Sequence, residues 1–231
     1  MNKPSQPISV IIPTLNEAEF IRLALASAQY SKGIELIVVD GGSQDNTTNV
    51  AKSLGANVIH SPPGRAQQMN MGARAAQGEF LVFLHADTRL PVRFVDHINH
   101  ILETPGVALG AFQLQIDGSS PELRIIERVA NWRSKYLGLP YGDQAIFIKK
   151  NIFNQVGGFP ELPIMEDFQL VRKVRRHGQV SIAPAPALTS QRRWQNVGPL
   201  RVTFINQMVL LGFFLGVDPT RLARWYGNKQ C

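Results

Sequence analysis

The triplet His85-Ala86-Asp87 combines residue types that could do chemistry with a position that favours it. It follows five apolar residues, 80–84, which predict a strand buried on both faces. In an open α/β sheet, ligands gather beyond the carboxyl ends of the strands, so Asp87 is expected at the rim of a site. A carboxylate there, with an imidazole two residues earlier, could hold a divalent cation and through it a diphosphate. The alternative is that Asp87-Thr88 only ends a strand and caps a helix.

Other polar clusters also follow strand-like runs. They are Pro13-Thr14-Leu15-Asn16-Glu17, Asp40-Gly41-Gly42-Ser43 and Gly142-Asp143-Gln144. Ionised carboxylates at strand ends can accept hydrogen bonds from the N–H and O–H groups of a base and a ribose. Glycines at 41 and 42 would let the backbone approach a ligand closely. Each cluster alone is ordinary turn or helix-start chemistry, so the prediction of a nucleotide site rests on their occurrence along one edge.

The elements that must position these clusters alternate in type through the first ninety residues. Strand-like runs occupy 8–12, 34–39, 57–60 and 80–84. Helical patterns occupy 17–30, with Asn16 as the expected N-cap, 44–54 and 65–76. Strands that alternate with helices through short turns imply right-handed crossovers and a mainly parallel sheet. The sequence therefore predicts an α/β fold with helices on both faces of the sheet.

The second half is less regular. Strands are predicted at 107–116 and 145–148, and helices at 122–137 and 167–177. We expect one domain over 1–188 and a helical extension over 189–231, within the same domain or appended to it. The extension holds an apolar region, 200–217, whose uninterrupted apolar run is too short to span a membrane. Packing on the core or against a second copy in a homodimer is favoured for it, and a helix in a membrane interface is the alternative.

Composition and charge narrow the range of partners. Hydrophobic residues make up 44% of the chain and charged residues 18%, as in ordinary folded proteins. The net charge of +7 suits phosphates or an anionic membrane surface. We expect no nucleic-acid partner, because zinc-finger spacing, aromatic RNA-binding signatures and basic heptads are all missing. The single cysteine, Cys231, and a start (1–7) without a secretory pattern predict a cytoplasmic location, with the inner face of a membrane as the alternative.

The ordered set of motifs resembles the family 2 glycosyltransferases. The resemblance covers residues 8–180 and includes Pro13 to Glu17, Val38 to Ser43 with Asp45 and Thr47, the basic helix from Arg65 to Gly78, the His85 to Asp87 triplet, Gly157-Gly158-Phe159 and Glu166-Asp167. It implies a GT-A type fold and inverting transfer of a sugar from a nucleoside-diphosphate donor. The whole chain also resembles a small bacterial subgroup associated with arsenosugar biosynthesis.

The resemblance implies roles for individual residues. Asp40 would bind the nucleobase, Thr14 and Glu17 would line base and ribose, and Asp87 would ligate Mn²⁺ or Mg²⁺ at the diphosphate. Asp167 would be the general base, with Glu166 its neighbour, because inverting transfer needs a group to take the acceptor proton. Two adjacent carboxylates can also raise each other's pKa. Uridine is the default base of the donor, and the acceptor is left open.

Two departures from the family pattern affect these roles. His85 stands where the first acid of the metal triplet is expected, and imidazole suits manganese better than magnesium. Met69-Asn70 replaces Arg-Asn in the third helix, so Arg65 is the candidate for the phosphate contact. The segment Gln191-Arg192-Arg193-Trp194 resembles, with shorter spacing, the Gln-x-x-Arg-Trp element of processive members and is expected to bind acceptor or phosphate.

Other functions fit the sequence less well. A nucleotidyltransferase would want a glycine-rich phosphate loop near the first strand, and 13–17 has none. A retaining glycosidase is disfavoured because adjacent residues rarely place carboxyl groups on opposite faces of one sugar. The main alternative is a non-catalytic nucleotide-sugar-binding or scaffold protein, which the change to His85 suggests and the presence of both Asp87 and Asp167 opposes.

Overall fold

The computed structural model describes residues 7–31 and 33–227. Residues 1–6, on which most of the expectation about a secretory signal rests, and Cys231 lie outside the described residues.

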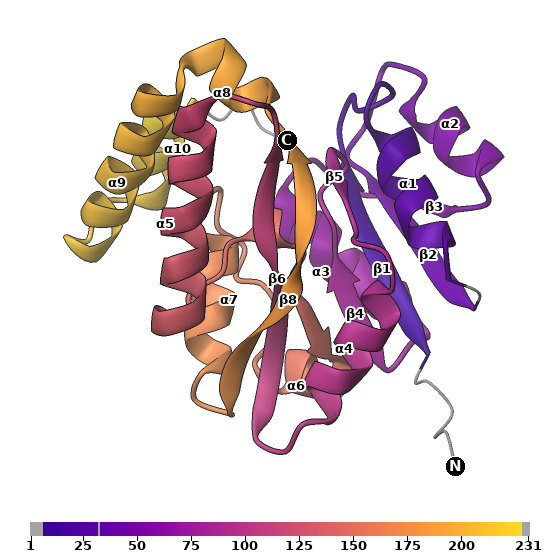
Figure 1. The fold of residues 1–231 in the computed structure, drawn as a ribbon. Coiled ribbons are helices and arrows are strands. Elements are labelled where there is room, and N and C mark those ends of the chain that lie inside the picture. The colour runs from indigo at the N-terminus through magenta and orange to yellow at the C-terminus, as the bar shows by residue number, and fades with distance from the viewer. Residues whose placement is uncertain (1–6, 32, 228–231) are drawn as a thin grey trace.

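One mixed sheet of eight strands runs through the described part of the chain (Figure 1). Its order is β3-β2-β1-β4-β7-β6-β8-β5. The strands are β1 (Ile8–Thr14), β2 (Ile34–Asp40), β3 (Asn57–His60), β4 (Phe80–Phe83), β5 (Thr88–Arg89), β6 (Val107–Asp117), β7 (Phe147–Lys149) and β8 (Gln179–Ser190). Neighbours among β1 to β4 are parallel, and so are β6 and β8, while β7 is antiparallel to β4 and β6, and β5 to β8. The predicted alternation in the first half is confirmed.

Helices cover both faces of the sheet and bury its apolar side chains. The helices are α1 (Ile21–Gln29), α2 (Thr47–Ser53), α3 (Arg65–Ala75), α4 (Phe94–Glu103), α5 (Pro121–Leu137), α6 (Lys150–Gln155), α7 (Glu166–Val174), α8 (Arg192–Val197), α9 (Pro199–Phe214) and α10 (Pro219–Tyr226), with a short 3₁₀ turn, η1, at Gly142–Gln144. One core cluster joins α1, α2 and α4 to one face, and a second joins α3, α6 and α7 to the other. The sheet is therefore held in a three-layer arrangement that leaves its strand ends open for a site.

The first helix begins later than the sequence pattern predicts. Asn16 has a φ of 55°, in the left-handed region, and α1 begins only at Ile21. The Asn16 side chain accepts a hydrogen bond from the Gln44 amide at 2.8 Å, in a different turn. The predicted N-cap role of Asn16 is therefore wrong, because the asparagine joins two turns of the site instead of capping the helix.

Strand β8 has no counterpart among the predicted elements. It contains Pro184 and Pro186, and proline normally argues against a strand inside a sheet. Both prolines point outward between buried Ala183, Ala185 and Ala187, and the ladder to β6 shifts register within this stretch. The irregularity tolerates the missing N–H groups, so the strand continues to Ser190.

The C-terminal helices share apolar cores with the body of the protein. Trp194 of α8 and Val202 of α9 pack with residues of α5 and β6. Val209 of α9 and Leu222 of α10 pack against residues before and within α7. The predicted boundary at 188/189 lies inside β8, and the shared cores favour the form of the prediction in which the extension belongs to the same domain. Among the described residues, no helix has the length and apolar character needed to cross a membrane.

Candidate active site at the carboxyl edge of the sheet

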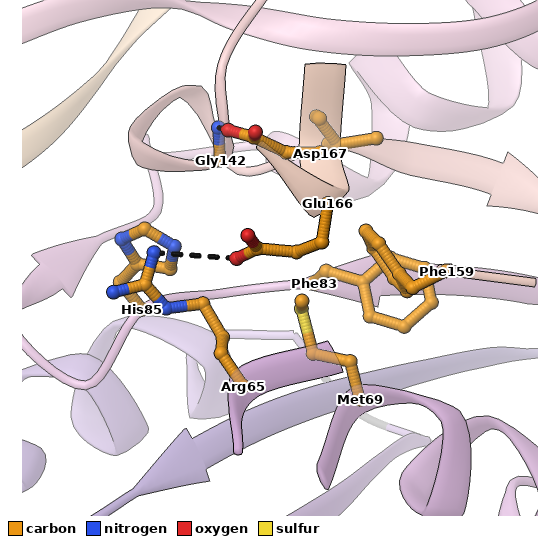
Figure 2. Close-up of a pocket in the computed structure, with 9 residues that line it drawn as sticks. Arg65, Met69, Phe83, His85, Gly142, Phe159, Glu166 and Asp167 are labelled. Carbon is orange, nitrogen blue, oxygen red and sulfur yellow. Dashed lines mark hydrogen bonds and ion pairs between the residues drawn. The ribbon is translucent and has the colours of Figure 1, made fainter. Parts of the chain in front are cut away.

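A small pocket lies where α7 and η1 meet the end of β4 (Figure 2). Its lining includes Arg65, His85, Gly142, Glu166 and Asp167. Asp167 accepts a hydrogen bond from the Gly142 amide through Oδ2 at 2.7 Å and one from the Phe168 amide through Oδ1 at 2.7 Å. These two bonds fix the orientation of the carboxylate at the first turn of α7. The structure thus brings together four predicted site residues that are far apart in the sequence: Arg65, His85, Glu166 and Asp167.

Glu166 differs from its neighbour in being buried. Its Oε1 lies 3.4 Å from Arg65 Nη1, and its side chain is almost fully removed from solvent. Burial raises the pKa of Glu166, Arg65 opposes this shift, and the charge of Asp167 adds to it. The expected mutual effect of the two acids on pKa is thus present for Glu166, although burial is the larger cause.

His85 stands beside the same pocket as a neutral imidazole. Desolvation and the nearby charges of Arg65 and Arg192 lower the pKa of His85 to about 3. A Cβ added at Gly142 would come within 2.8 Å of His85 Nε2, so the packing of this ring requires glycine at 142. Neutral His85 keeps a lone pair on one ring nitrogen, which a metal or a hydroxyl group could use.

Asp143 and Asp87 add two further carboxylates to this edge. Desolvation raises the pKa of Asp143 to about 6, Arg133 opposes the shift, and the charges of Asp167 and Asp87 add to it. The Asp143 Oδ1 atom is buried without a hydrogen-bond partner among the described residues. Such an atom is costly in a folded protein unless a ligand or water satisfies it. Asp143 is therefore poised for a partner that the described residues do not supply.

Arg192 connects the C-terminal helices to this edge. Its Nη1 and Nη2 atoms contact the Glu17 carboxylate at 2.8 and 2.6 Å, and its Nε atom lies 3.0 Å from Asp87 Oδ2. The guanidinium also stacks over the Phe20 ring at 4.5 Å. Burial raises the pKa of Glu17, and Arg192 opposes that shift. One arginine thus holds two predicted donor-site acids from segments more than a hundred residues away.

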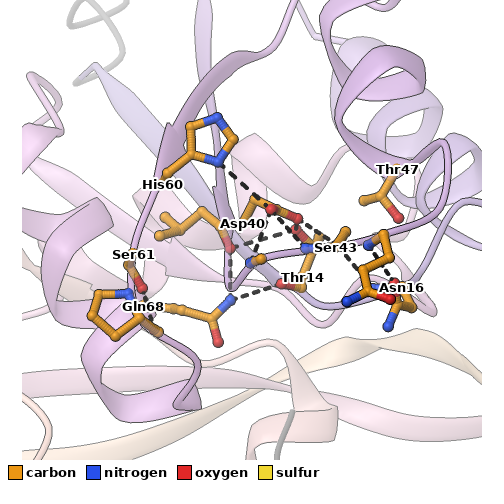
Figure 3. Close-up of polar contacts among 12 residues, drawn as sticks. Thr14, Asn16, Asp40, Ser43, Thr47, His60, Ser61 and Gln68 are labelled. Atoms are coloured by element: carbon orange, nitrogen blue, oxygen red, sulfur yellow. Dashed lines mark hydrogen bonds and ion pairs between the residues drawn. The ribbon is translucent and has the colours of Figure 1, made fainter.

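The turn after β2 forms a second polar centre (Figure 3). Asp40 Oδ2 accepts hydrogen bonds from the Gly42 and Ser43 amides at 3.0 and 2.9 Å. Asp40 Oδ1 accepts from the Ser43 hydroxyl and, at 3.4 Å, from the Thr14 hydroxyl. The carboxylate is buried, so its bonds shape the turn, and its expected contact with a nucleobase stays a prediction. The left-handed φ of 98° at Gly42 explains why glycine occupies this turn.

The ends of β1 and β2 are tied together by side chains. Thr14 and Asp40 are paired in register, and Gln68 Nε2 donates to the backbone oxygens of Thr14 and Val39 at 2.8 and 2.7 Å (Figure 3). The Asn16 amide donates to Ser43 Oγ at 2.8 Å. Gln68 was missed by sequence reasoning, because a glutamine within a helix carries no signal of such a role. Pro13 lies in β1 beside this centre and has no amide hydrogen to donate.

The segment 191–194 divides between site and core. Trp194 lies buried with Leu123 and Val202, and a Cβ added at Gly118 would meet the Gln191 side chain at 2.3 Å. Neither residue lines the pocket. Arg193 instead stacks over Tyr226 of α10 at 3.6 Å, and burial raises the pKa of Tyr226, whose electrostatic neighbours include Arg65, Asp143 and Asp167. The sequence analysis did not foresee the contact between Arg193 and Tyr226.

The side chains of the site that could coordinate a metal suit a divalent cation only if a bound ligand completes the coordination. No group of three or more His, Cys, Asp or Glu side chains that could hold a metal ion occurs within residues 7–31 and 33–227. Asp87, the unpartnered Oδ1 of Asp143 and neutral His85 nevertheless offer oxygen and nitrogen donors along one edge. These residues fit a cation whose remaining coordination comes from the oxygens of a diphosphate.

Comparison with protein families gives one match over most of the chain. Residues 9–159 match the model described as Glycosyl transferase family 2. An uncharacterized glycosyltransferase of Rickettsia conorii is 32% identical over 190 residues, which are 73% of this chain and 31% of that protein. A PGL/p-HBAD biosynthesis glycosyltransferase of Mycobacterium bovis is 40% identical over 91 residues, 36% of each chain. This chain spans about a third of the length of these curated relatives.

Solved structures share the fold at low sequence identity. A mannosyltransferase from Pyrobaculum calidifontis in complex with GDP-Man and Mn²⁺ has a TM-score of 0.64 at 20% identity, covering 79% of this chain and 56% of that one. Residues 1–349 of S. aureus TarS in complex with UDP-GlcNAc give 0.62 at 18%, with coverage of 79% and 58%. Glucosyl-3-phosphoglycerate synthase from Mycobacterium tuberculosis, with Mn²⁺ and UDP, gives 0.58 at 21%, with 80% and 70%. The predicted GT-A type fold is confirmed.

Proposed function

The chain belongs to glycosyl transferase family 2, and we propose that it is an inverting transferase that moves a sugar from a nucleoside-diphosphate donor to an acceptor hydroxyl. The observation that carries the proposal is the convergence of Asp87, Asp143 and Asp167 with Arg65 and Arg192 at one strand edge. Carboxylates and guanidinium groups are the two charge types that such a reaction needs. The acids handle hydroxyl protons, and the arginines stabilise the leaving diphosphate.

Asp167 is the proposed general base. Both of its oxygens are oriented by backbone amides, and each keeps lone-pair capacity for an acceptor hydroxyl. As the acceptor oxygen attacks the anomeric carbon, its proton passes to Asp167. The bond between that carbon and the diphosphate oxygen breaks on the opposite side, and its electron pair leaves with the nucleoside diphosphate. Attack from the side opposite the leaving group inverts the anomeric centre.

Glu166 is proposed as a positioning residue. It is buried and paired with Arg65 at 3.4 Å, so it holds the guanidinium at the pocket. Arg65 then faces the negative charge that develops on the departing diphosphate, as does Arg192. The two adjacent acids thus have different proposed roles: Asp167 takes the acceptor proton, and Glu166 positions Arg65 toward the leaving group.

A divalent cation is proposed at the diphosphate. Asp87 would hold it, with His85 and Asp143 as further donors, and His85 favours Mn²⁺ over Mg²⁺. When bound, the cation neutralises charge on the diphosphate and improves it as a leaving group. Asp87 would then lose part of its ion pair with Arg192. Because Arg192 belongs to α8, we expect α8 to shift when the donor binds.

The turns after β1 and β2 are proposed to receive the nucleoside. Thr14, Glu17 and Asp40 supply oxygens, and Gly42 lets the backbone approach the ligand. Uridine remains the default base, although one structural relative is in complex with UDP-GlcNAc and another with GDP-Man. Donor choice therefore needs a direct comparison of the two nucleotides.

The acceptor is proposed to bind between the pocket and the C-terminal helices. Arg193 of α8 stacks over Tyr226 of α10, and this combination of positive charge and a ring with a hydroxyl suits a polar, anionic acceptor. Gln191 and Trp194 are proposed to support this region from the core. The resemblance to proteins associated with arsenosugar biosynthesis is compatible with this chemistry and remains a proposal.

The experiment that tests the function is turnover of a panel of UDP-sugars and GDP-sugars with and without Mn²⁺. We expect release of nucleoside diphosphate from one donor class. With an acceptor present, NMR of the product should give the anomeric configuration opposite to that of the donor. Retained configuration would contradict the mechanism. Donor binding without turnover under every acceptor condition would favour the scaffold alternative.

A further inference from the structure

Large apolar side chains are exposed very unevenly over the described part of the chain. Among the large apolar side chains of the described residues, only Leu23, Tyr30 and Val92 are exposed outside the segments 125–137 and 197–225. All the other large apolar residues that are exposed lie within 125–137 and 197–225. Single exposed apolar residues are normal on a protein surface, whereas a concentration of this kind marks an interaction site.

Helix α5 carries a continuous apolar stripe on its outer side. Ile125, Val129, Trp132 and Tyr136 recur at steps of four, three and four residues, so they lie along one line of the helix. The side that packs on the sheet is opposite and contains buried Ala130. The side chains of the stripe are therefore not part of the core of the described structure.

Helix α9 has the same design. Leu200, Phe204, Met208 and Leu211 follow one another at steps of four, four and three residues and are all exposed. Val209, on the inner side, is buried against residues next to α7. Two sequence-distant helices thus each present an apolar line away from the core.

The two helices are neighbours, and each turns its apolar stripe away from the core that they share. Figure 1 shows α5 and α9 running side by side at one end of the molecule. They share a buried cluster that contains Leu123 and Ala130 of α5 and Val202 of α9. Both helices are more than 20 Å long at 1.5 Å per residue. We call the exposed faces of α5 and α9 the α5–α9 face.

Basic side chains border the α5–α9 face. Arg128 and Lys135 are exposed beside the stripe of α5, and Arg201 is exposed beside the stripe of α9. The exposed acids of 121–137 and 192–226 are Glu122 and Asp218, which lie at the starts of α5 and α10, while Glu127 is buried and paired with Arg124. The surface is therefore apolar in its middle and positive at its margin.

We propose that the α5–α9 face docks on a lipid bilayer that contains anionic lipids. Aromatic and aliphatic side chains flanked by Arg and Lys are the composition of helices that lie in a membrane interface. The long basic side chains can reach lipid phosphates while their methylene groups cover apolar surface. An apolar protein interface alone would not need the positive border, which is why lipid is favoured over a second copy of the chain. This inference does not depend on the proposed sugar transfer.

The docked orientation would bring the candidate active site close to the bilayer. Gly198 links α9 directly to α8, whose Arg192 contacts Glu17 and Asp87. A surface that holds α9 thus also borders the helix that contacts the donor-site acids.

The test is flotation of the full chain with vesicles of phosphatidylcholine alone or with one third phosphatidylglycerol. We expect binding to the anionic vesicles that weakens in high salt. The variant Trp132→Ser/Phe204→Ser, at residues 56% and 65% exposed, should lower the ratio of bound to free protein about tenfold or more. The matched control Tyr30→Ser/Val92→Ser, at residues 77% and 75% exposed, should bind like the parent.

Three results would overturn the proposal, and one would support it further. Equal binding of both double variants, or binding to neither vesicle type, would overturn it. Sedimentation velocity provides the second measurement. A dimer that is dispersed by Trp132→Ser/Phe204→Ser, without vesicle binding by the parent, would assign the face to a second copy. The conservative variant Trp132→Tyr/Phe204→Leu should keep vesicle binding, and thermal unfolding of Trp132→Ser/Phe204→Ser checks that the fold of that variant is intact.

Discussion

Two acidic centres lie at the same edge of the sheet and are built in opposite ways. Asp40 is buried, but backbone amides and hydroxyls of its own and the neighbouring turn donate hydrogen bonds to both of its oxygens. Around the pocket, the charges of Asp87 and Asp167 both raise the pKa of Asp143, and an oxygen of Asp143 has no partner among the described residues. The first centre is satisfied by the protein and gives the edge its shape. The second holds one buried carboxylate oxygen that the described residues leave without a partner, which is typical of a functional site.

The largest expected effect is on the chemistry at the pocket. Asp167→Asn should lower kcat by about 1000-fold, because general-base catalysis typically contributes 10²–10⁴-fold. Donor affinity should change little, since the side-chain oxygen of the introduced asparagine can still accept the hydrogen bond from the Gly142 backbone N–H. The measurement is steady-state turnover together with calorimetric donor titration. The exposed variant Asp96→Asn is the matched control, and an equal loss in both variants would contradict the assigned role.

The second prediction is that a substitution at Asp143 stabilises the protein instead of destabilising it. Its pKa is about 6 in the folded protein against an ordinary value of 3.8, so the neutral form contributes stability that is lost as pH rises from about 4 through 6. Asp143→Asn stays neutral and should be more stable than the parent at pH 8 by at most about 3 kcal/mol, and equally stable near pH 4. Chemical denaturation at both values tests this, and destabilisation at pH 8 would contradict the crowded-acid interpretation. Donor affinity should fall in the same variant.

Asp40 should respond in the opposite direction. Asp40→Asn removes charge-assisted hydrogen bonds from a buried turn, so it should destabilise the protein by about 2 kcal/mol. The control is Asp117→Asn, which removes an exposed ion pair with Arg89 and should cost less than about 0.5 kcal/mol. Equal effects at 40 and 117 would show that the turn is not organised by its carboxylate.

The smallest effect is expected at the link between the two centres. Arg192→Met leaves the buried Glu17 carboxylate without its partner and should cost about 1–2 kcal/mol, less than a fully buried pair because Arg192 is partly exposed. Adding Glu17→Gln should recover most of that loss. A double-mutant cycle on unfolding free energies measures the coupling, and simple additivity would refute the link.

Local sequence pattern was enough for the first half of the fold. Residues 8–88 alternate strands and helices through short turns, so each element could be identified from its own residues. Strand β8 was missed because Pro184 and Pro186 contradict strand chemistry unless the register shift against β6 is known. Tertiary pairing thus overrode local preference there.

The site was predictable in part for a related reason. Arg65, His85 and Asp167 were identified from motifs, and the fold brings them to one pocket. Contacts between distant segments carry no local signal, so the pairing of Arg192 with Glu17 and the stacking of Arg193 over Tyr226 could not be foreseen. Asn16 was misread because its side chain serves a neighbouring turn, which helix-cap patterns do not encode.

The most direct test of the central claim is calorimetric titration of the full chain with UDP and GDP, with and without Mn²⁺, beside Asp87→Ala. We predict that one nucleotide binds, that Mn²⁺ strengthens its binding, and that the gain from Mn²⁺ is lost in Asp87→Ala. If neither nucleotide binds under any metal condition, the crowded acids serve another ligand and the proposed transfer from a nucleoside-diphosphate sugar is wrong.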